Sequence, residues 1–308
     1  MSCPLSARHC CRPYGEEIAD KKTTLLQIIT RFATAYSATI GGTAKNIETA
    51  ELCGGARICY IFHETFGSTL EKINPLQNLT SLDILTAIRN ATGPRPALFI
   101  PEVTFELLVK RQIKRLVDPS LNCVELVHEE MQRIVQNCGI EIQQEMQRFP
   151  RLYDRINSVV STVLKSRLVP TRQFVENLID IELAYINTKH KHPEFAADAA
   201  MVGLMKREEN RPVNSEKERK ELTEREQRDC QVIERLIKSY FMIIRKNVQD
   251  AVPKAIMNFL VNYVQEHLQS ELVKQLYRNE IIDDLLAERL KVKLWLSNVG
   301  KLSRCSML

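Results

Sequence analysis

Glycine is scarce in this sequence, and the common glycine-rich phosphate-binding patterns are missing. The chain has 10 Gly among 308 residues, which disfavours a loop-rich α/β enzyme and favours a helical body. No G-x-x-x-x-G-K-[ST], G-x-G-x-x-G, G-x-S-x-G or H-E-x-x-H pattern occurs, so we find no phosphate-cradling loop, nucleophile elbow or zinc-protease helix. We therefore predict no catalytic residues and no cofactor-binding residues in this chain.

Histidine and cysteine never gather at the spacing of metal ligands. The six His are dispersed, and the i, i+2 spacing of His190 and His192 does not place two ligands on one helix face. The segment 9–11 (His-Cys-Cys) lacks a second pair of ligands. The nine Cys show no repeated spacing, which is typical of reduced thiols in a cytoplasmic protein. We predict that the chain binds no metal.

Long apolar runs and a basic surface are missing as well. No stretch approaches the roughly 20 apolar residues of a membrane-spanning helix, and residues 1–15 lack the apolar core of a signal peptide, so we expect a soluble protein. The net charge of +5 arises from the end of the chain, where five basic and no acidic side chains follow Glu288. A neutral body without a basic stripe argues against nucleic-acid binding.

Apolar residues recur mainly at helical spacing. We find no convincing run of alternating apolar and polar residues that would predict a sheet. The fold class is therefore predicted to be all-α. Apolar residues recur at helical spacing in segments 16–74, 82–91, 101–118, 121–138, 152–164, 174–186 and 225–286. In segment 101–118 the stripe is expected on Val103, Leu107, Leu108 and Ile113.

The clearest pattern is the stretch from Arg225 to Leu286, which predicts two long amphipathic helices hinged at Pro253. In the second helix, the apolar residues of one face recur mostly at spacings of four. Its apolar residues are Val252, Ile256, Leu260, Val264, Leu268, Leu272 and Leu276. At about 1.5 Å per residue, helices of this length span some tens of Å, which is typical of scaffolds and assembly proteins.

Glycine and proline mark the expected breaks. The pairs Gly41-Gly42 and Gly54-Gly55 indicate a kink or a close approach of two backbones, and Asn74-Pro75 ends the first helical region. Ser81 is a candidate N-cap for the next helix, and residues 92–96 cannot be helical because they hold two Pro and one Gly.

Two further proline positions are expected to separate helices. One helix is predicted to end near Asp118-Pro119, and another to begin at Pro170-Thr171. Residues 205–228 are charged and almost free of apolar side chains, as in a solvated linker or an exposed lead-in to a helix.

Several segments of the sequence resemble the dynamin-like GTPases that divide mitochondria and peroxisomes. They lie at 42–49 (GTAKNIET), 51–67 (ELCGGARICYIFHETFG), 89–99 (RNATGPRPALF), 182–190 (ELAYINTKH), 225–230 (REQRDC) and 232–241 (VIERLIKSYF). The likeness spans roughly residues 16–288. It implies the stalk, or middle domain, and the GTPase effector domain of that family, folded as an elongated antiparallel helical bundle.

The resemblance implies a division of the chain. Residues 1–15 are an irregular N-terminus and 16–204 a partial stalk. Residues 205–224 form a short charged linker in place of the family's variable insert. Residues 225–288 are a partial effector domain, and 289–308 are a divergent basic tail. The family's GTPase domain, with its GTP and Mg²⁺, has no counterpart in this sequence.

The resemblance also points to assembly residues. Gly93, Pro94, Arg95 and Pro96 match a family loop implicated in the step from dimer to tetramer. Proline limits the freedom of such a loop, so docking costs less entropy, and Arg95 supplies a planar fork of donors; a plain turn between helices is the alternative. Gly54 and Gly55 fall in a stretch that the family links to assembly, although helix packing alone would explain them.

Three residues are candidates for modification. Thr223 aligns with a phosphorylated family serine, with Arg219 and Lys220 before it and Glu221 interrupting the basic run. Cys230 aligns with a family cysteine reported as redox-modified; a half-buried helix cysteine is the alternative. Cys305 begins a C-terminal Cys-Ser-Met-Leu sequence that fits the form of a prenylation box, and an intact mass without lipid on Cys305 would refute that hypothesis.

The resemblance implies self-association, association with a full-length fission dynamin and with adaptors of the mitochondrial outer membrane, and recruitment from the cytoplasm to mitochondria and peroxisomes. Membrane association would be indirect, and the chain itself would not hydrolyse GTP. One alternative is that the sequence is part of a full GTPase that constricts membranes. Another is a membrane-surface adaptor that binds through the basic, Trp-containing tail.

Overall fold

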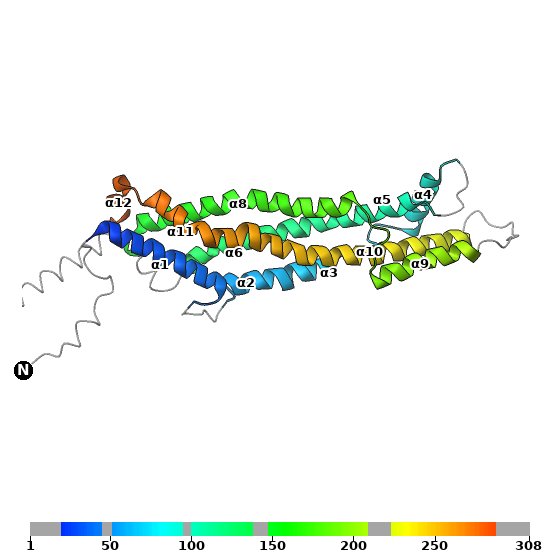
Figure 1. Cartoon of the computed structure of the whole chain (residues 1–308), viewed down its shortest axis with the longest axis horizontal. Coiled ribbons are helices and arrows are strands. Elements are labelled where there is room, and N and C mark those ends of the chain that lie inside the picture. The colour runs from blue at the N-terminus through cyan, green and yellow to red at the C-terminus, as the bar shows by residue number, and fades with distance from the viewer. Residues whose placement is uncertain (1–19, 45–50, 95–99, 138–146, 209–222, 288–308) are drawn as a thin grey trace, which may run out of the picture. The chain divides into compact units, whose positions relative to one another are not determined.

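The computed structural model describes residues 20–44, 51–94, 100–137, 147–208 and 223–287 (Figure 1). Helices joined by short connections make up these residues, and no strand occurs among them, which confirms the all-α prediction. The chain separates into two compact units that alternate along the sequence. The first comprises Met1–Tyr60, Leu126–Pro170 and Met257–Leu308, and the second Ile61–Glu125 and Thr171–Ile256.

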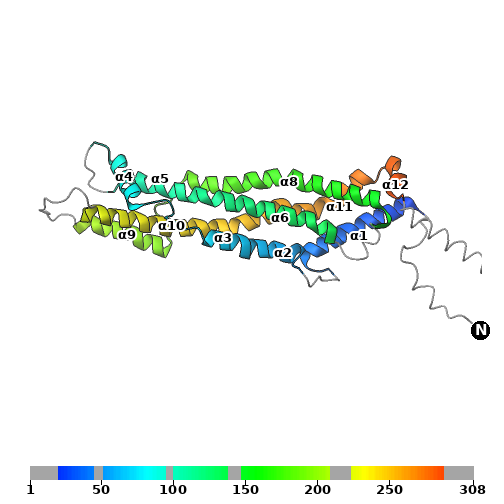
Figure 2. The same ribbon diagram turned by 180° about the vertical axis from the view of Figure 1, so that it is seen from behind.

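The first unit is built around α1 (Lys21–Gly41), which packs against α2 (Gly54–Tyr60), α11 (Tyr263–Leu276) and α12 (Asn279–Leu285). Figures 1 and 2 show α1 alongside α11 from opposite sides. The buried face of α1 recurs at helical spacing and consists of Leu25, Ile28, Ile29, Phe32, Ala33, Tyr36 and Ile40. Burial of such a stripe drives helices together because it removes apolar surface from water.

Polar contacts set the register within the first unit. Tyr36 is fully buried, and its hydroxyl donates a hydrogen bond of 2.8 Å to the backbone carbonyl of Met131 on α6 (Val117–Asn137). The guanidinium of Arg167, on α8 (Pro150–Ala184), lies 3.3 Å from the ring centroid of Tyr263. Buried hydroxyls and cation–π pairs stabilise one arrangement because misplacing them leaves polar groups without partners.

The second unit is organised by α10 (Glu224–Ile256), which packs against α4 (Ser81–Thr92), α5 (Glu102–Ile113) and α9 (Pro193–Glu208). The π-helix η2 (Ile61–Gly67) leads into the short helix α3 (Ser68–Glu71), and η3 (Lys114–Leu116) is a 3₁₀ turn between α5 and α6. An aromatic cluster joins three of these helices. The Phe105, Phe195 and Tyr240 rings lie 5.3 to 6.1 Å apart between centroids, and the Tyr240 hydroxyl accepts a 3.0 Å bond from the Asn187 amide.

Proline interrupts these helices less than we expected. The predicted hinge at Pro253 is wrong: α10 continues through it to Ile256, and a π-helix, η4 (Met257–Asn262), then leads directly into α11. Pro170 likewise lies inside α8, where two helices were predicted. A proline removes one backbone donor, and a long helix tolerates that loss when buried residues flank it, as Val252 and Ile256 flank Pro253.

The other two differences concern helix ends. No helix ends at Asp118-Pro119, because α6 begins at Val117 and Pro119 lies in its first turn, where a backbone donor has no partner inside the helix. Ser81 is not the N-cap of α4: Thr80 is, in a capping box in which the Asp83 amide donates to the Thr80 hydroxyl and the Asp83 carboxylate accepts from the Thr80 amide.

The buried face of α5 also differs from the expected one. Val103 and Leu107 are 57% and 61% exposed, whereas Leu108 and Ile113 are buried as predicted. The residues that share the buried face are Thr104, Phe105, Leu108, Val109, Gln112 and Ile113. Two of these six residues, Thr104 and Gln112, are polar. A stripe predicted from apolar residues alone therefore included the exposed Val103 and Leu107 and missed part of the buried face.

The two glycine pairs have different structural roles where α1 meets α2. Gly42 ends α1 in the left-handed conformation, with φ of 68°. At Gly54 and Gly55 the two backbones meet: a Cβ added to Gly54 would lie 2.5 Å from the Thr39 carbonyl oxygen, and one added to Gly55 would lie 1.9 Å from that of Ile40. Of the two predicted explanations for this pair, the close backbone approach is therefore confirmed.

A side chain at position 55 should separate α1 from α2. We expect Gly55→Ala to lower the free energy of unfolding by about 1–3 kcal/mol, because the new methyl group overlaps a backbone oxygen that cannot rotate away. The measurement is urea unfolding followed by circular dichroism. Gly41→Ala is the matched control, since an added Cβ there would lie 3.9 Å from the Thr43 hydroxyl. Equal midpoints for the two variants would contradict the packing argument.

Candidate functional site

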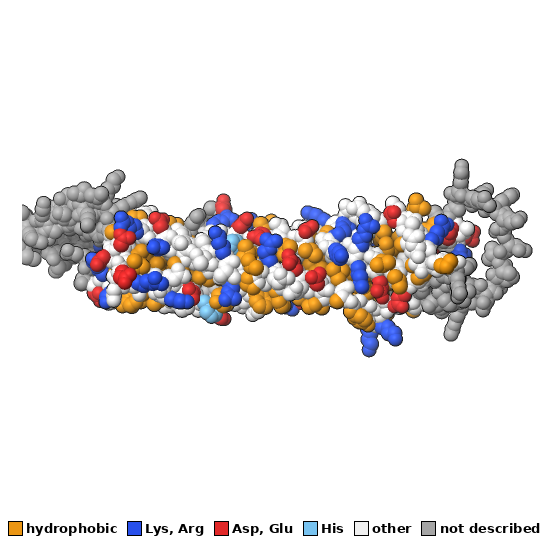
Figure 3. Space-filling view, turned by 90° about the horizontal axis from the view of Figure 1, so that it is seen from above, with side chains coloured by type: hydrophobic (Ala, Val, Ile, Leu, Met, Phe, Trp, Pro, Cys, Tyr) orange, Lys and Arg blue, Asp and Glu red, His pale blue; other side chains and the backbone are white. Residues whose placement is uncertain are grey.

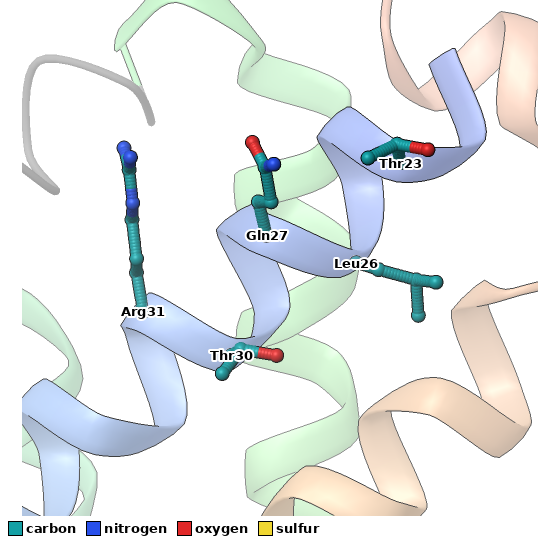
Figure 4. Close-up of a pocket in the computed structure, with 5 residues that line it drawn as sticks. All are labelled: Thr23, Leu26, Gln27, Thr30 and Arg31. Atoms are coloured by element: carbon teal, nitrogen blue, oxygen red, sulfur yellow. The ribbon is translucent and has the colours of Figure 1, made fainter. Parts of the chain in front are cut away.

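The described residues contain no constellation for catalysis. They hold no group of three or more His, Cys, Asp or Glu side chains that could bind a metal ion. A shallow hollow is lined by Thr23, Leu26, Gln27, Thr30 and Arg31 (Figure 4), and all five side chains come from α1. Groups on one helix face do not converge on a common point, so the hollow has no features of an active site.

The Gly54-Gly55 junction is held by a buried carboxylate. Glu130, on α6, is 1% exposed on its side chain and accepts a 2.7 Å hydrogen bond from the Gly54 amide, at the start of α2. Burial raises the pKa of Glu130, while the Gly54 bond and the guanidinium of Arg133, 3.3 Å away, act in the opposite direction. The carboxylate fixes the first turn of α2, so this predicted assembly step is also a packing junction.

Only half of the predicted assembly loop lies in the described part of the chain. Gly93 follows the last residue of α4 with φ of 68° and ψ of −154°, and a Cβ there would meet nothing within 4 Å. Pro94 follows it in a turn. Arg95 and Pro96 lie outside the described residues. Gly93 is therefore required by its backbone conformation and not by crowding.

Arg89, one helical turn before Gly93, connects this end of α4 to the start of α10. Its guanidinium lies 2.6 Å from the carboxylate of Glu226. Glu226 also forms a capping box with Thr223, whose hydroxyl donates to Oε2 at 3.0 Å and accepts from the Glu226 amide at 3.3 Å. The bond from Arg89, followed by the bonds from Thr223, lowers the pKa of Glu226.

Thr223 thus caps the start of α10. Of the two predicted alternatives for residues 205–228, a solvated linker or a lead-in to a helix, residues 224–228 belong to a helix. The Thr223 side chain is exposed, but its hydroxyl is engaged with Glu226. Residues 209–222, which precede Thr223, lie outside the described part of the chain. The start of the predicted linker, residues 205–208, belongs to α9. The sequence analysis did not predict α9, and only its last four residues lie in the charged stretch.

The structure describes only one of the two cysteines that are candidates for modification. The Cys230 thiol is 2% exposed and donates a 3.5 Å bond to the Ser81 carbonyl oxygen. Burial, together with the nearby carboxylates of Glu234 and Asp229, raises its pKa. Little thiolate forms under those conditions, so Cys230 has the features of a packing residue and not of a reactive thiol. Cys305 lies outside the described residues.

Sequence analysis missed an exposed apolar stripe on α8, in the second unit. Phe174, Ile181 and Tyr185 are 38%, 68% and 73% exposed, and half-buried Leu178 lies between them. The i, i+4, i+7 spacing of Phe174, Leu178 and Ile181 puts these three on one side of α8, and Tyr185 follows directly after the helix ends at Ala184. The same spacing predicted a helix in this segment, but spacing cannot say whether a stripe faces a core or solvent.

One face of the described part of the chain is mixed in charge (Figure 3). Figure 3 shows one face on which Lys and Arg side chains alternate with Asp and Glu, without a field of one sign. This agrees with the neutral balance of the body that we derived from the sequence. No helix in the described part of the chain is both long and apolar enough to cross a membrane.

Comparisons with known proteins agree with the helical architecture. The model of the dynamin central region matches residues 7–202, and that of the dynamin GTPase effector domain matches residues 225–294. The chain is 55% identical to the dynamin-1-like protein drp-1 of Caenorhabditis elegans and 52% identical to the dynamin-1-like protein of Danio rerio, over 89% of this chain and 50% and 49% of those proteins.

A more distant relative is the dynamin-related protein DNM1 of Saccharomyces cerevisiae, which is 36% identical over 87% of this chain and 48% of its own length. The chain spans about half the length of the curated relatives it matches. The central-region model alone matches well over half of the chain, and the effector-domain model matches a second, separate region. The chain therefore belongs to the dynamin family.

Proposed function

We propose that this chain is a self-assembling stalk and effector segment of a dynamin-related protein that divides mitochondria and peroxisomes. It acts by oligomerisation and not by catalysis. The observation that carries the proposal is the exposed stripe formed by Phe174, Leu178 and Ile181 on α8 and by Tyr185 just after its end. Family membership supplies the context, because stalk and effector regions are where the resemblance places assembly.

The stripe suits a protein partner for two physical reasons. Aromatic residues are enriched at interfaces, where they bury much apolar area at little conformational cost. Each Å² of apolar surface removed from water contributes about 25 cal/mol, so a stripe of four large side chains is a substantial source of association energy. A narrow seam of this spacing on a helix is the pattern by which helices pair.

The occupant that we propose for the stripe is a second copy of the chain or a full-length relative. GTP and Mg²⁺ enter only through such a full-length partner, since no residue of this chain is proposed to bind them. Recruitment from the cytoplasm to the mitochondrial outer membrane and peroxisomes, through adaptors and not through direct membrane insertion, follows from the same family context.

A charge in the stripe should weaken self-association. We expect Ile181→Lys to reduce it roughly tenfold or more, because burying an unpaired ammonium in an apolar contact is costly. Sedimentation velocity over a range of concentrations measures the effect. Gln173→Lys is the matched control, since it adds the same charge at an exposed position of α8 outside the stripe. A chain that stays monomeric, or variants that associate equally, would refute the proposed interface.

The loop after α4 provides an independent test of assembly. We expect replacement of residues 93–96 by alanine to abolish co-purification with a full-length fission dynamin, because Gly93 has a positive φ that alanine rarely adopts and proline restricts the backbone. Unchanged helical circular dichroism would show that the fold survives. Retained co-purification would count against a role for this loop in assembly.

We also propose that Thr223 is a phosphorylation site. A phosphate there would replace the hydroxyl hydrogen that bonds Glu226, and would place about −1.5 to −2 charges beside that carboxylate. The Arg89–Glu226 pair would then be disturbed at the end of α4 that leads to the loop. Treatment with a basic-directed kinase followed by mass spectrometry tests the site, and Thr223→Val provides the unmodifiable control. Absence of phosphate on Thr223 after complete treatment would rule it out.

A further inference from the structure

The outer face of α5, in the second unit, carries an exposed apolar pair. Val103 and Leu107 are 57% and 61% exposed, and their spacing of four places them about one turn apart on the same side of the helix. The opposite side of α5 holds its buried residues, which are Thr104, Phe105, Leu108, Val109, Gln112 and Ile113. The pair therefore lies at the centre of the face that α5 turns away from the core of its unit.

A loose ion pair flanks these two apolar residues. The Lys110 ammonium nitrogen lies 3.8 Å from a carboxylate oxygen of Glu106, and both side chains are partly exposed. This separation is longer than a hydrogen bond, so both groups can bond a further partner. Because Glu106 and Lys110 are four residues apart, they lie on the same flank of the helix. The outer face thus combines apolar surface with one acidic and one basic group along a single edge.

That arrangement is complementary to itself when two copies of α5 pair antiparallel. A twofold axis between antiparallel helices brings the same flank of each helix together, and residue i contacts residue j wherever j contacts i. With the axis level with Leu108, Glu106 of each copy lies level with Lys110 of the other, and two ion pairs form. A parallel arrangement would set Glu106 against Glu106, so the charges favour the antiparallel one.

The apolar pair fits the same arrangement. A helix rise of about 1.5 Å per residue places Leu107 within about 3 Å, measured along the helix, of Leu107 of the second copy. Val103 lies near the level of Lys114 of the second copy. Lys114 is exposed, and the aliphatic stem of a lysine can cover apolar surface while its ammonium group stays in water. One register therefore buries both apolar residues and pairs both charges.

We propose that the outer face of α5 is a twofold interface, which pairs antiparallel with the same face of a second copy of this chain and is centred near Leu108. The pairing rests on the proposed self-association and adds a contact on a helix other than α8. One twofold contact closes at two copies, whereas a chain with two self-binding contacts can form longer assemblies. The α5 pairing and the α8 stripe together therefore allow oligomers beyond a dimer.

Exchanging charges between copies tests the pairing on the full chain. In Glu106→Lys only lysines face each other across the interface, and in Lys110→Glu only glutamates do. In a mixture of the two variants every lysine faces a glutamate. We expect each variant alone to associate roughly tenfold more weakly than the unaltered chain, and the mixture to recover most of that loss. Sedimentation velocity with one variant fluorescently labelled, at low ionic strength, measures both quantities.

The Asp250–Lys254 pair on α10 provides the matched control. It has the same i, i+4 spacing with the acidic residue first, and both side chains are exposed. Among the described residues, none of the large exposed apolar side chains lies on α10. Asp250→Lys and Lys254→Glu should therefore leave self-association unchanged, and their mixture should gain nothing. This control separates pairing on α5 from a general effect of net charge.

A second exchange set tests the twofold axis itself. Near such an axis a residue meets its own copy, so Leu107→Lys and Leu107→Glu should each oppose self-association. A mixture of these two variants should associate roughly tenfold more tightly than either alone. Leu107 is exposed, so neither change enters the core of the unit. Circular dichroism shows which variants fold, and this set decides the outcome if a variant at Glu106 or Lys110 does not.

Mixtures that associate no more tightly than their single components would overturn the α5 interface. If Ile181→Lys still weakens self-association in that case, the proposed self-assembly stands and only the α5 pairing is wrong. A control mixture from α10 that gains as much as the α5 mixture would also overturn the pairing, because the gain would then come from net charge.

Discussion

The rest of the structure depends on keeping one apolar face of each long helix buried over many turns. An α-helix rotates about 100° per residue, so the spacing of apolar residues decides where its buried face runs. Where the repeat is close to 3.6, as on α1, a regular helix suffices. The runs α2–η2–α3 and α10–η4–α11 each include one π-helix, and buried residues continue through it. The buried face is thus kept along regular α-helix and π-helix alike.

Within each unit a small number of specific contacts turns generic helix packing into one arrangement. In the first unit, two glycines bring α2 against the end of α1, and the buried Glu130 carboxylate caps α2. In the second, the cluster of Phe105, Phe195 and Tyr240 joins α5, α9 and α10. Both devices need close complementarity, because a backbone contact and an aromatic edge contact each lose their energy over a few tenths of an ångström.

Phe174, Ile181 and Thr223 lie on the surface of this framework, whereas the candidates Gly54 and Cys230 are buried. The stripe on α8 and the end of α4 present side chains outward, and the Thr223–Glu226–Arg89 cluster connects the start of α10 to the end of α4. Such features suit contact with another large molecule better than chemistry on a small one. The resemblance to dynamin stalks and the exposed stripe therefore point to the same kind of function by independent routes.

The sequence by itself determined the helical class and the family. It narrowed the Gly54-Gly55 pair to a kink or a close approach of two backbones, because glycine placement is a local signal, and the structure decided for the close approach. Only the tertiary structure decided which face of α5 is buried, since polar Thr104 and Gln112 lie inside while Val103 and Leu107 face solvent. It also decided that Pro170 and Pro253 lie within helices, because flanking burial outweighs one lost hydrogen bond. The exposure of Phe174, Ile181 and Tyr185 was equally invisible in the sequence, because a stripe has the same spacing whether it meets a core or is left for a partner.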